Sequence, residues 1–281
     1  MIHIGKINTL QVGESLPFGF HLSSGDDNDP LVLLTHENMA TMPEKVKTGD
    51  TLDIFVGIDE TGNLEAWPQT PVAQAGDTVV LKATGATNFG AFFDWGGQRD
   101  LLVPADMQDG PVNEGMRYVV HIYHDESTGR ILGATRLHRF IKESSETLKA
   151  GDGVECLVYS KTELGFKVVI NGEALGLIFH SDAFKPLKTG QRLDAVIKTI
   201  REDGKIDVAL QRTDKTGRKT LEEAILEDLE AHGGVSILTD KSKPEDIYAH
   251  FNVSKAAYKK ALGALYKQRK ITITKDAVKL N

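Results

Sequence analysis

One short pattern recurs three times along the chain, and this repetition constrains the fold more than any single residue does. In the second copy, Gly76-Asp77 opens a run of alternating apolar residues, followed by Asn88–Phe92 and Asp100–Pro104. The third copy restarts at Gly151-Asp152, and Phe18-Gly19-Phe20 marks a blurred first copy. A spacing of about 75 residues is too long for a solenoid repeat and typical of a small domain. The sequence therefore predicts three small domains in tandem.

The third copy is expected to contain five short strands. Its apolar residues alternate with period two, and Asn171-Gly172 is a two-residue hairpin signal. The expected strands cover residues 154–159, 166–170, 175–179, 193–199 and 205–210. Five strands with one irregular link favour a small Greek-key barrel of the oligonucleotide/oligosaccharide-binding (OB) kind. Periodicity alone leaves an SH3-like barrel open as the alternative.

After about residue 218 the composition changes to that of helices. Thr220 and Ser254 are candidate N-caps, and Gly233-Gly234 is a helix stop. The expected elements are a helix from Thr220 to Gly233, a helix from Pro244 through Phe251, a helix from Ser254 to about Gln268, and a hairpin of 271–274 with 277–280. Three helices and a terminal hairpin predict a winged helix-turn-helix. The expected fold class is thus mainly β with a C-terminal α/β module, with domains at 1–69, 70–140, 146–213 and 218–281.

The second copy resembles the S1-type RNA-binding domain, whose pattern is Phe-Gly-Ala-Phe-Val followed by Gly-Leu-Val-His-Ile-Ser. Phe89 and Phe92 match the two aromatic positions, and Val103 stands where the histidine would be. The resemblance implies that these aromatic side chains lie on the exposed barrel face and stack on bases. Stacking of this kind contributes about 1–3 kcal/mol per base. The structural alternative is that one Phe of the pair belongs to the core.

The other two copies depart from this pattern. In the third copy Leu164 and Lys167 take the aromatic positions, and Phe179 takes the histidine position. These departures favour contact with the RNA backbone by the third domain. In the first copy Phe18 and His21 take the aromatic places. There Asn63 replaces the basic residue that Arg130 and Lys205 supply in the second and third copies.

Lysines of the third predicted helix are candidate phosphate contacts. Tyr258, Leu262 and Leu265 share one face and form the expected core stripe. The other side of the helix carries Lys255, Lys259, Lys260 and Lys267. A solvated lysine face with no ligand is the plain alternative. Beside base-stacking domains, phosphate contact is the preferred interpretation.

Charge is distributed unevenly along the chain. The net charge is −7 overall, and residues 1–70 alone carry −8, with 3 Lys or Arg against 11 Asp or Glu. The segments 71–140, 141–212 and 213–281 carry −2, 0 and +3. Because phosphate attraction is a local field effect, the C-terminal half is the expected nucleic-acid side. The acidic first domain is expected to contribute little to RNA binding.

Composition favours a cytoplasmic protein without cofactors. No apolar run approaches the roughly 18 residues of a membrane span, and the start lacks a secretory signal pattern. Cys156 is the only cysteine, which fits a reducing compartment, and its apolar surroundings predict a buried structural thiol. No cofactor is expected.

Catalytic and metal-binding patterns were sought, and none fits. The stretch 216–220 lacks the glycine spacing of a Walker phosphate loop. His121 and His124 are expected on opposite faces of one strand, and 26–29 reads as a solvated acidic turn rather than a calcium loop. A non-enzymatic protein is therefore expected.

Taken together, these motifs resemble the conserved virulence factor B family. The resemblance is carried by Glu163–Val168 with Leu175–Ile178, by Asp240-Lys241-Ser242 with Pro244–Tyr248, and by Ser254–Lys267. It covers essentially the whole chain and is strongest after residue 150. The family implies three S1-type barrels, a C-terminal winged helix, RNA binding and a bacterial regulatory role. It names no catalytic residues.

The favoured hypothesis is a protein that contacts single-stranded RNA through the second and third barrels and the winged helix. Two alternatives stay open. One is a DNA-binding regulator that places its last helix in the major groove, and the other is a protein-interaction scaffold that uses the acidic first barrel. Only Gln268 offers a short-range base reader on that helix, which favours backbone contact. The sequence predicts no oligomeric state.

Overall fold

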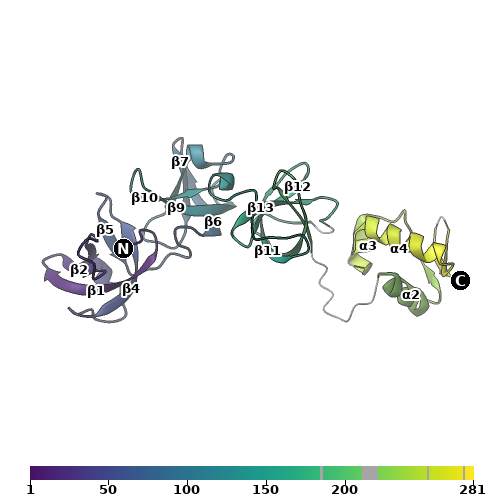
Figure 1. The fold of residues 1–281 in the computed structure, drawn as a ribbon, viewed down its shortest axis with the longest axis horizontal. Coiled ribbons are helices and arrows are strands. Elements are labelled where there is room, and N and C mark those ends of the chain that lie inside the picture. The colour runs from purple at the N-terminus through teal and green to yellow at the C-terminus, as the bar shows by residue number, and fades with distance from the viewer. Residues whose placement is uncertain (184–185, 211–220, 252, 275) are drawn as a thin grey trace. The chain divides into compact units, whose positions relative to one another are not determined.

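The computed structural model describes residues 1–183, 186–210, 221–251, 253–274 and 276–281 (Figure 1). The chain forms two compact units, Met1–Lys142 and Glu143–Asn281. The first unit holds the first two repeat copies, and the second unit holds the third copy and the helical segment. None of the described helices has the length and apolar composition needed to cross a membrane.

The first copy is a closed five-stranded barrel with the strand order β1-β2-β3-β5-β4. Its elements are β1 (Ile7–Leu16), β2 (Gly19–Ser23), β3 (Val32–Thr35), the short helix α1 (His36–Ala40), β4 (Thr51–Ile58) and β5 (Leu64–Trp67). Parallel pairing of Leu33 with Glu65 closes the barrel. Residues of β1 alternate between exposed and buried, so Leu10 and Val12 enter the core.

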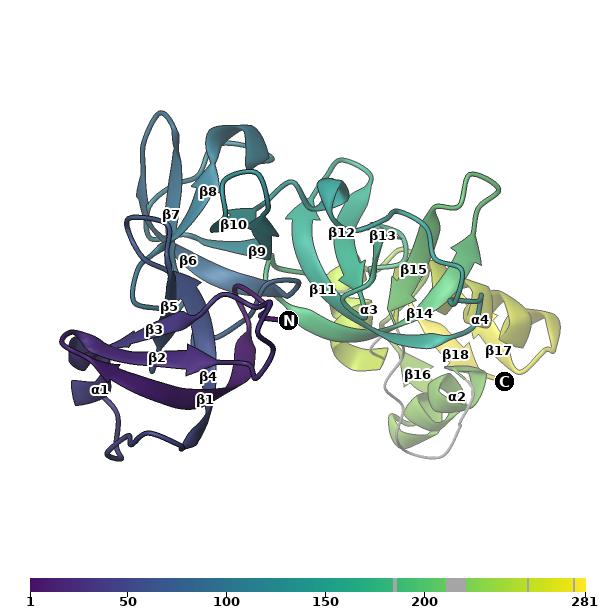
Figure 2. The same cartoon turned by 60° about the vertical axis from the view of Figure 1, so that its left-hand side comes forward.

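The second copy is a five-stranded sheet with the order β10-β9-β6-β7-β8, and the sheet stays open between β8 and β10 (Figure 2). Its elements are β6 (Thr78–Ala86), β7 (Gly90–Asp94), β8 (Leu101–Pro104), the 3-10 turn η1 (Ala105–Met107), β9 (Arg117–Asp125), β10 (Arg130–Ala134) and a second 3-10 turn, η2 (Leu137–Arg139). Three closed barrels were expected, but the second copy forms an open one.

The loop before β8 packs against the first barrel. Trp95 leaves the end of β7 and is buried, with its indole N–H donating to the Arg99 carbonyl at 2.7 Å. Trp95 packs edge-on against Phe55 and Trp67 of the first barrel, with ring centres 5.8 and 6.1 Å apart. After this loop, β8 begins at Leu101 and has four residues.

The third copy is a closed barrel with the order β11-β12-β13-β15-β14. Its strands are β11 (Gly153–Lys161), β12 (Gly165–Ile170), β13 (Ala174–Phe179), β14 (Arg192–Ile200) and β15 (Ile206–Leu210). Asn171 and Gly172 both adopt left-handed backbone angles, φ 49° and 77°, as a type I′ hairpin turn requires. Parallel pairing of β13 with β15 closes the barrel. The predicted strands are confirmed.

The C-terminal segment is a winged helix, as predicted. Its elements are α2 (Leu221–Ala231), β16 (Val235–Ser236), α3 (Pro244–Phe251), α4 (Lys255–Lys267), β17 (Ile271–Ile273) and β18 (Val278–Leu280). The Ser254 hydroxyl caps α4 by accepting from the Ala257 N–H at 3.2 Å. The predicted cap at Thr220 lies outside the described residues. Tyr258, Leu262 and Leu265 are buried, which confirms the predicted core stripe.

Candidate nucleic-acid interface

The second barrel displays an aromatic pair on its outer face. Phe89, in the turn before β7, is 64% exposed, and Phe92 on β7 is half-buried. Their rings meet edge to face with centres 6.0 Å apart. Ala91 and Phe93 point the other way and are fully buried. Neither Phe of the predicted pair therefore belongs to the core, because Phe93 takes that place.

The aromatic face continues across the sheet to a cation. Phe92 lies directly opposite Leu102 on β8, so both side chains are on the same face. Leu102 and the exposed Arg130 line one pocket at the open edge. The sequence motif missed Leu102. The alternation along β8, with Leu101 and Val103 buried, is the signal that reveals it.

The structure corrects one position of the motif alignment. Gly90 pairs with Pro104 in the second barrel, and the equivalent Gly165 pairs with Phe179 in the third. Pro104 therefore occupies the position of Phe179. Val103 is fully buried and corresponds to the equally buried Ile178. A one-residue shift along a strand moves a side chain to the opposite face, so Val103 cannot stand at the histidine position.

On the third barrel, three predicted site residues lie around one pocket of about 260 Å³. Lys167 on β12, Phe179 on β13 and Lys205 before β15 all line it, together with the 65% exposed Leu164. Lys167 lies across from Leu177, as Phe92 lies across from Leu102. The predicted binding face of the third barrel is thus the same sheet surface as in the second, with a lysine in place of the aromatic ring.

Arg201 joins this pocket, although the motif did not predict it. Its guanidinium lies 5.5 Å from the centre of the Phe179 ring, within cation–π distance. Two hydrogen bonds from Nε and Nη2 to the Asp207 carboxylate, 3.0 and 2.7 Å long, fix its orientation. The bond to Asp207 also raises the pKa of Arg201 above its ordinary value. Lys205 is held more loosely, 3.8 Å from Glu143.

The first barrel presents a weaker version of the same face. Phe18 is 56% exposed and His21 is half-buried. Asn63, at the position of Arg130 and Lys205, is neutral, and its backbone and side-chain N–H groups bond to Asp59 at 2.9 and 3.2 Å. The aromatic element is present, but the cation is missing.

The predicted lysines of the winged helix lie at or near the surface of α4. Lys259, Lys260 and Lys267 are exposed and Lys255 is half-buried. Tyr266 is 56% exposed and lies two helical turns after Lys259, on the same side of the helix. Tyr266 therefore adds an exposed aromatic ring to the lysine-bearing surface of this helix.

The His, Cys, Asp and Glu side chains of the described residues do not gather into a metal site. Among the described residues, no group of three or more His, Cys, Asp or Glu side chains could hold a metal ion. His121 is buried and stacks on Phe140 at 4.9 Å. Cys156 is fully buried, as predicted, and burial raises the pKa of its thiol to about 12. A thiol of this kind is a poor nucleophile at neutral pH.

This protein belongs to the class of multidomain proteins that combine OB-type barrels with a C-terminal winged helix. Each of its barrels has an aromatic or basic outer face. Residues 223–280 match the family model of the CvfB-like winged helix domain. The chain is 25% identical to the uncharacterized protein YitL of Bacillus subtilis, over 95% of this chain and 90% of that protein. It is 24% identical to conserved virulence factor B of Staphylococcus epidermidis, over 97% and 95% of the two chains.

The winged-helix match and these near full-length similarities support the resemblance of the chain to the conserved virulence factor B family. A crystal structure of a multidomain protein with nucleic acid binding domains from Streptococcus pneumoniae is also similar. It shares 23% identity, covers 99% of this chain and 98% of that one, and has a TM-score of 0.41.

Proposed function

We propose that this chain is a non-catalytic RNA-binding protein and a post-transcriptional regulator. It contacts single-stranded RNA through the second and third barrels and the winged helix. The observation that carries the proposal is the exposed edge-to-face pair of Phe89 and Phe92, with Arg130 on the same side of the sheet. Exposed aromatic rings beside a cation are the elements that single-strand binders use on OB folds.

The third barrel supports the proposal through charge. Its pocket combines Lys167, Lys205 and Arg201 with two aromatic side chains, Phe179 and the half-buried Tyr159. Three cations beside the Phe179 ring suit phosphate contact next to a stacked base. We therefore assign this barrel mainly to the RNA backbone.

The winged helix supports the proposal through its exposed lysines. Lys259, Lys260 and Lys267 are free to approach phosphates, and Tyr266 adds a stacking surface between them. Lysine is a point charge with little ability to discriminate bases, so this helix contributes affinity more than sequence preference. The lone, buried Cys156 fits a site of action in the cytoplasm.

Affinities of the full-length chain for labelled oligonucleotides, measured across a salt series, test the proposal. We expect single-stranded RNA to bind more tightly than single-stranded DNA of the same sequence and than duplex DNA. The logarithm of the affinity should fall linearly with the logarithm of the salt concentration. Tighter binding of duplex DNA would instead support a DNA-binding regulator. Absence of binding to all three probes would contradict the proposal and favour a protein scaffold.

A further inference from the structure

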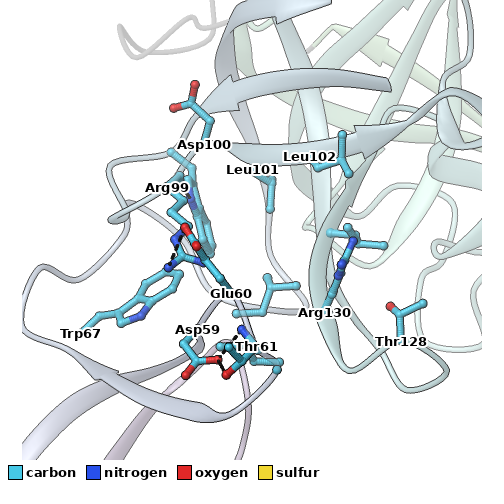
Figure 3. A pocket seen from close by; sticks show the side chains of 15 residues that line it. Asp59, Glu60, Thr61, Trp67, Arg99, Asp100, Leu101, Leu102, Thr128 and Arg130 are labelled. Atoms are coloured by element: carbon cyan, nitrogen blue, oxygen red, sulfur yellow. Dashed lines mark hydrogen bonds and ion pairs between the residues drawn. The ribbon is translucent and has the colours of Figure 1, made fainter. Parts of the chain in front are cut away.

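A pocket of about 490 Å³ lies where the open edge of the second barrel meets the first barrel (Figure 3). Residues of β8 and β10 form one side, through Leu102 and Arg130. The turn between β4 and β5 forms the other side, through Glu60. The pocket size lies within the roughly 300–1,000 Å³ range of small-molecule sites.

The pocket is preformed by rigid surroundings. Phe55, Trp67 and Trp95 form one aromatic cluster that joins the two barrels, with Phe55 and Trp67 stacked at 5.4 Å. All three are buried, so they support the pocket floor rather than offer ring faces to a ligand. A 2.8 Å hydrogen bond from the Ala75 N–H to the Gly5 carbonyl reinforces the join.

The turn that carries Glu60 is also fixed. The Asp59 carboxylate accepts hydrogen bonds from the backbone N–H groups of Thr61 and Asn63, at 2.8 and 2.9 Å. Desolvation alone would raise the pKa of Asp59, but the hydrogen bonds from Asn63 and Thr61 lower it to about 2. Asp59 is thus committed to holding the turn, which places Glu60 at the rim of the pocket.

The rim carries both signs of charge (Figure 3). Arg99 and Arg130 supply two guanidinium groups, while Glu60 and Asp100 supply carboxylates. Glu60 is 84% exposed and lies 3.7 Å from Arg99, beyond hydrogen-bond distance, so its oxygens can accept from a ligand. Asp100 already accepts from the Thr84 hydroxyl at 2.6 Å. A ligand that fits this rim carries an anion for the arginines and N–H donors for Glu60.

We infer that this pocket binds one nucleotide of the RNA and selects guanine through Glu60. Guanine is the standard base whose Watson–Crick edge has two adjacent N–H donors, N1–H and N2–H, which one carboxylate accepts side by side. The arginines contact its phosphate, and Leu102 continues the surface toward Phe92. The inference rests on the proposed RNA binding and gives the acidic first barrel a role that its charge did not predict.

Affinities for short oligouridines with one central guanosine, adenosine or inosine test this inference in the full-length chain. We expect the guanosine probe to bind about tenfold more tightly than the adenosine probe, with inosine between them because it lacks the 2-amino group. Glu60→Gln should remove most of this preference. Glu14→Gln, an exposed change of the same charge on β1, should preserve it. Thermal unfolding should confirm that both variants are folded.

The outcomes separate this inference from the proposed function. Equal affinity for the guanosine and adenosine probes would overturn the pocket assignment and leave RNA binding intact. The same conclusion follows if Glu60→Gln keeps the full guanosine preference. If the unaltered chain binds none of the probes, the proposed function fails and this inference fails with it.

Discussion

Arg201 lies over the Phe179 ring at 5.5 Å and is held there by two hydrogen bonds to Asp207. The arrangement orients a cation and an aromatic ring within one pocket before any ligand arrives. An oriented guanidinium loses less conformational entropy on binding than a mobile side chain. We propose that this pair compensates in the third barrel for the missing aromatic residue at Lys167.

Arg201→Ala should weaken binding of single-stranded RNA and flatten its salt dependence. Loss of one phosphate contact changes the slope of log affinity against log salt by about 0.7 for a single strand. Arg201→Lys keeps the charge and should keep most of that slope while losing the bidentate bond to Asp207. Fluorescence anisotropy across a salt series measures both quantities. A wild-type slope in Arg201→Ala would remove Arg201 from the interface.

Replacing Lys255, Lys259 and Lys260 together with Gln should weaken RNA binding about equally for different RNA sequences. The slope should fall by up to about 0.7 for each phosphate contact that is lost. Exposed substitutions of this kind usually change the free energy of unfolding by less than about 0.5 kcal/mol. Wild-type affinity and slope in the triple variant would exclude the winged helix from the RNA site. Loss of duplex DNA binding alone would favour the DNA-binding alternative.

Trp67→Ala should destabilise the whole Met1–Lys142 unit rather than the first barrel alone. Trp67 belongs to the same core cluster as Trp95 and Leu81 of the second barrel. Truncating a buried tryptophan typically costs about 3–5 kcal/mol of unfolding free energy. Urea unfolding followed by tryptophan fluorescence and by circular dichroism should show one shifted transition. A loss of signal from the first barrel with the second unaffected would contradict this coupling.

Stability of the first unit should fall as the pH drops below 6.5. Burial lowers the pKa of His121 from its ordinary value of 6.5, with partial opposition from Asp77. Below pH 6.5 the unfolded chain therefore binds a proton that the folded chain resists, so acid favours unfolding. His121→Gln should reduce this pH dependence, whereas His138→Gln, at an exposed position, should leave it unchanged. Urea unfolding at pH values above and below 6.5 measures the pH dependence of the unfolding free energy. The same pH dependence in the unaltered chain and in both variants would contradict the prediction.

The sequence predicted the repeat, the strands and the winged helix because each depends on local patterns. Alternation places Phe93 inward, and Asn171-Gly172 specifies a tight turn by its backbone preferences alone. The open edge of the second barrel was not predictable in this way. The packing of Trp95 against Phe55, which lies in another repeat copy, is likewise invisible in local patterns.

The candidate site was predicted in part for the same reason. Phe89, Lys167 and Lys205 stand at positions that the motif marks. In the structure Phe89 is exposed, and Lys167 and Lys205 line a pocket. Arg201 and Tyr266 were not predicted as site residues because no motif position marks them. The shift from Val103 to Pro104 became visible only through strand register. Their roles in binding RNA remain predictions.

The most direct test of the account is the RNA affinity of the Phe89→Ala, Phe92→Ala double variant. Phe18→Ala is the matched control, since it removes an exposed ring from the acidic first barrel. The double variant should lose about 1–3 kcal/mol of binding free energy per stacked base, with little change in salt slope, while the control should bind normally. Unchanged affinity in a double variant that is folded by circular dichroism would contradict base stacking on the second barrel.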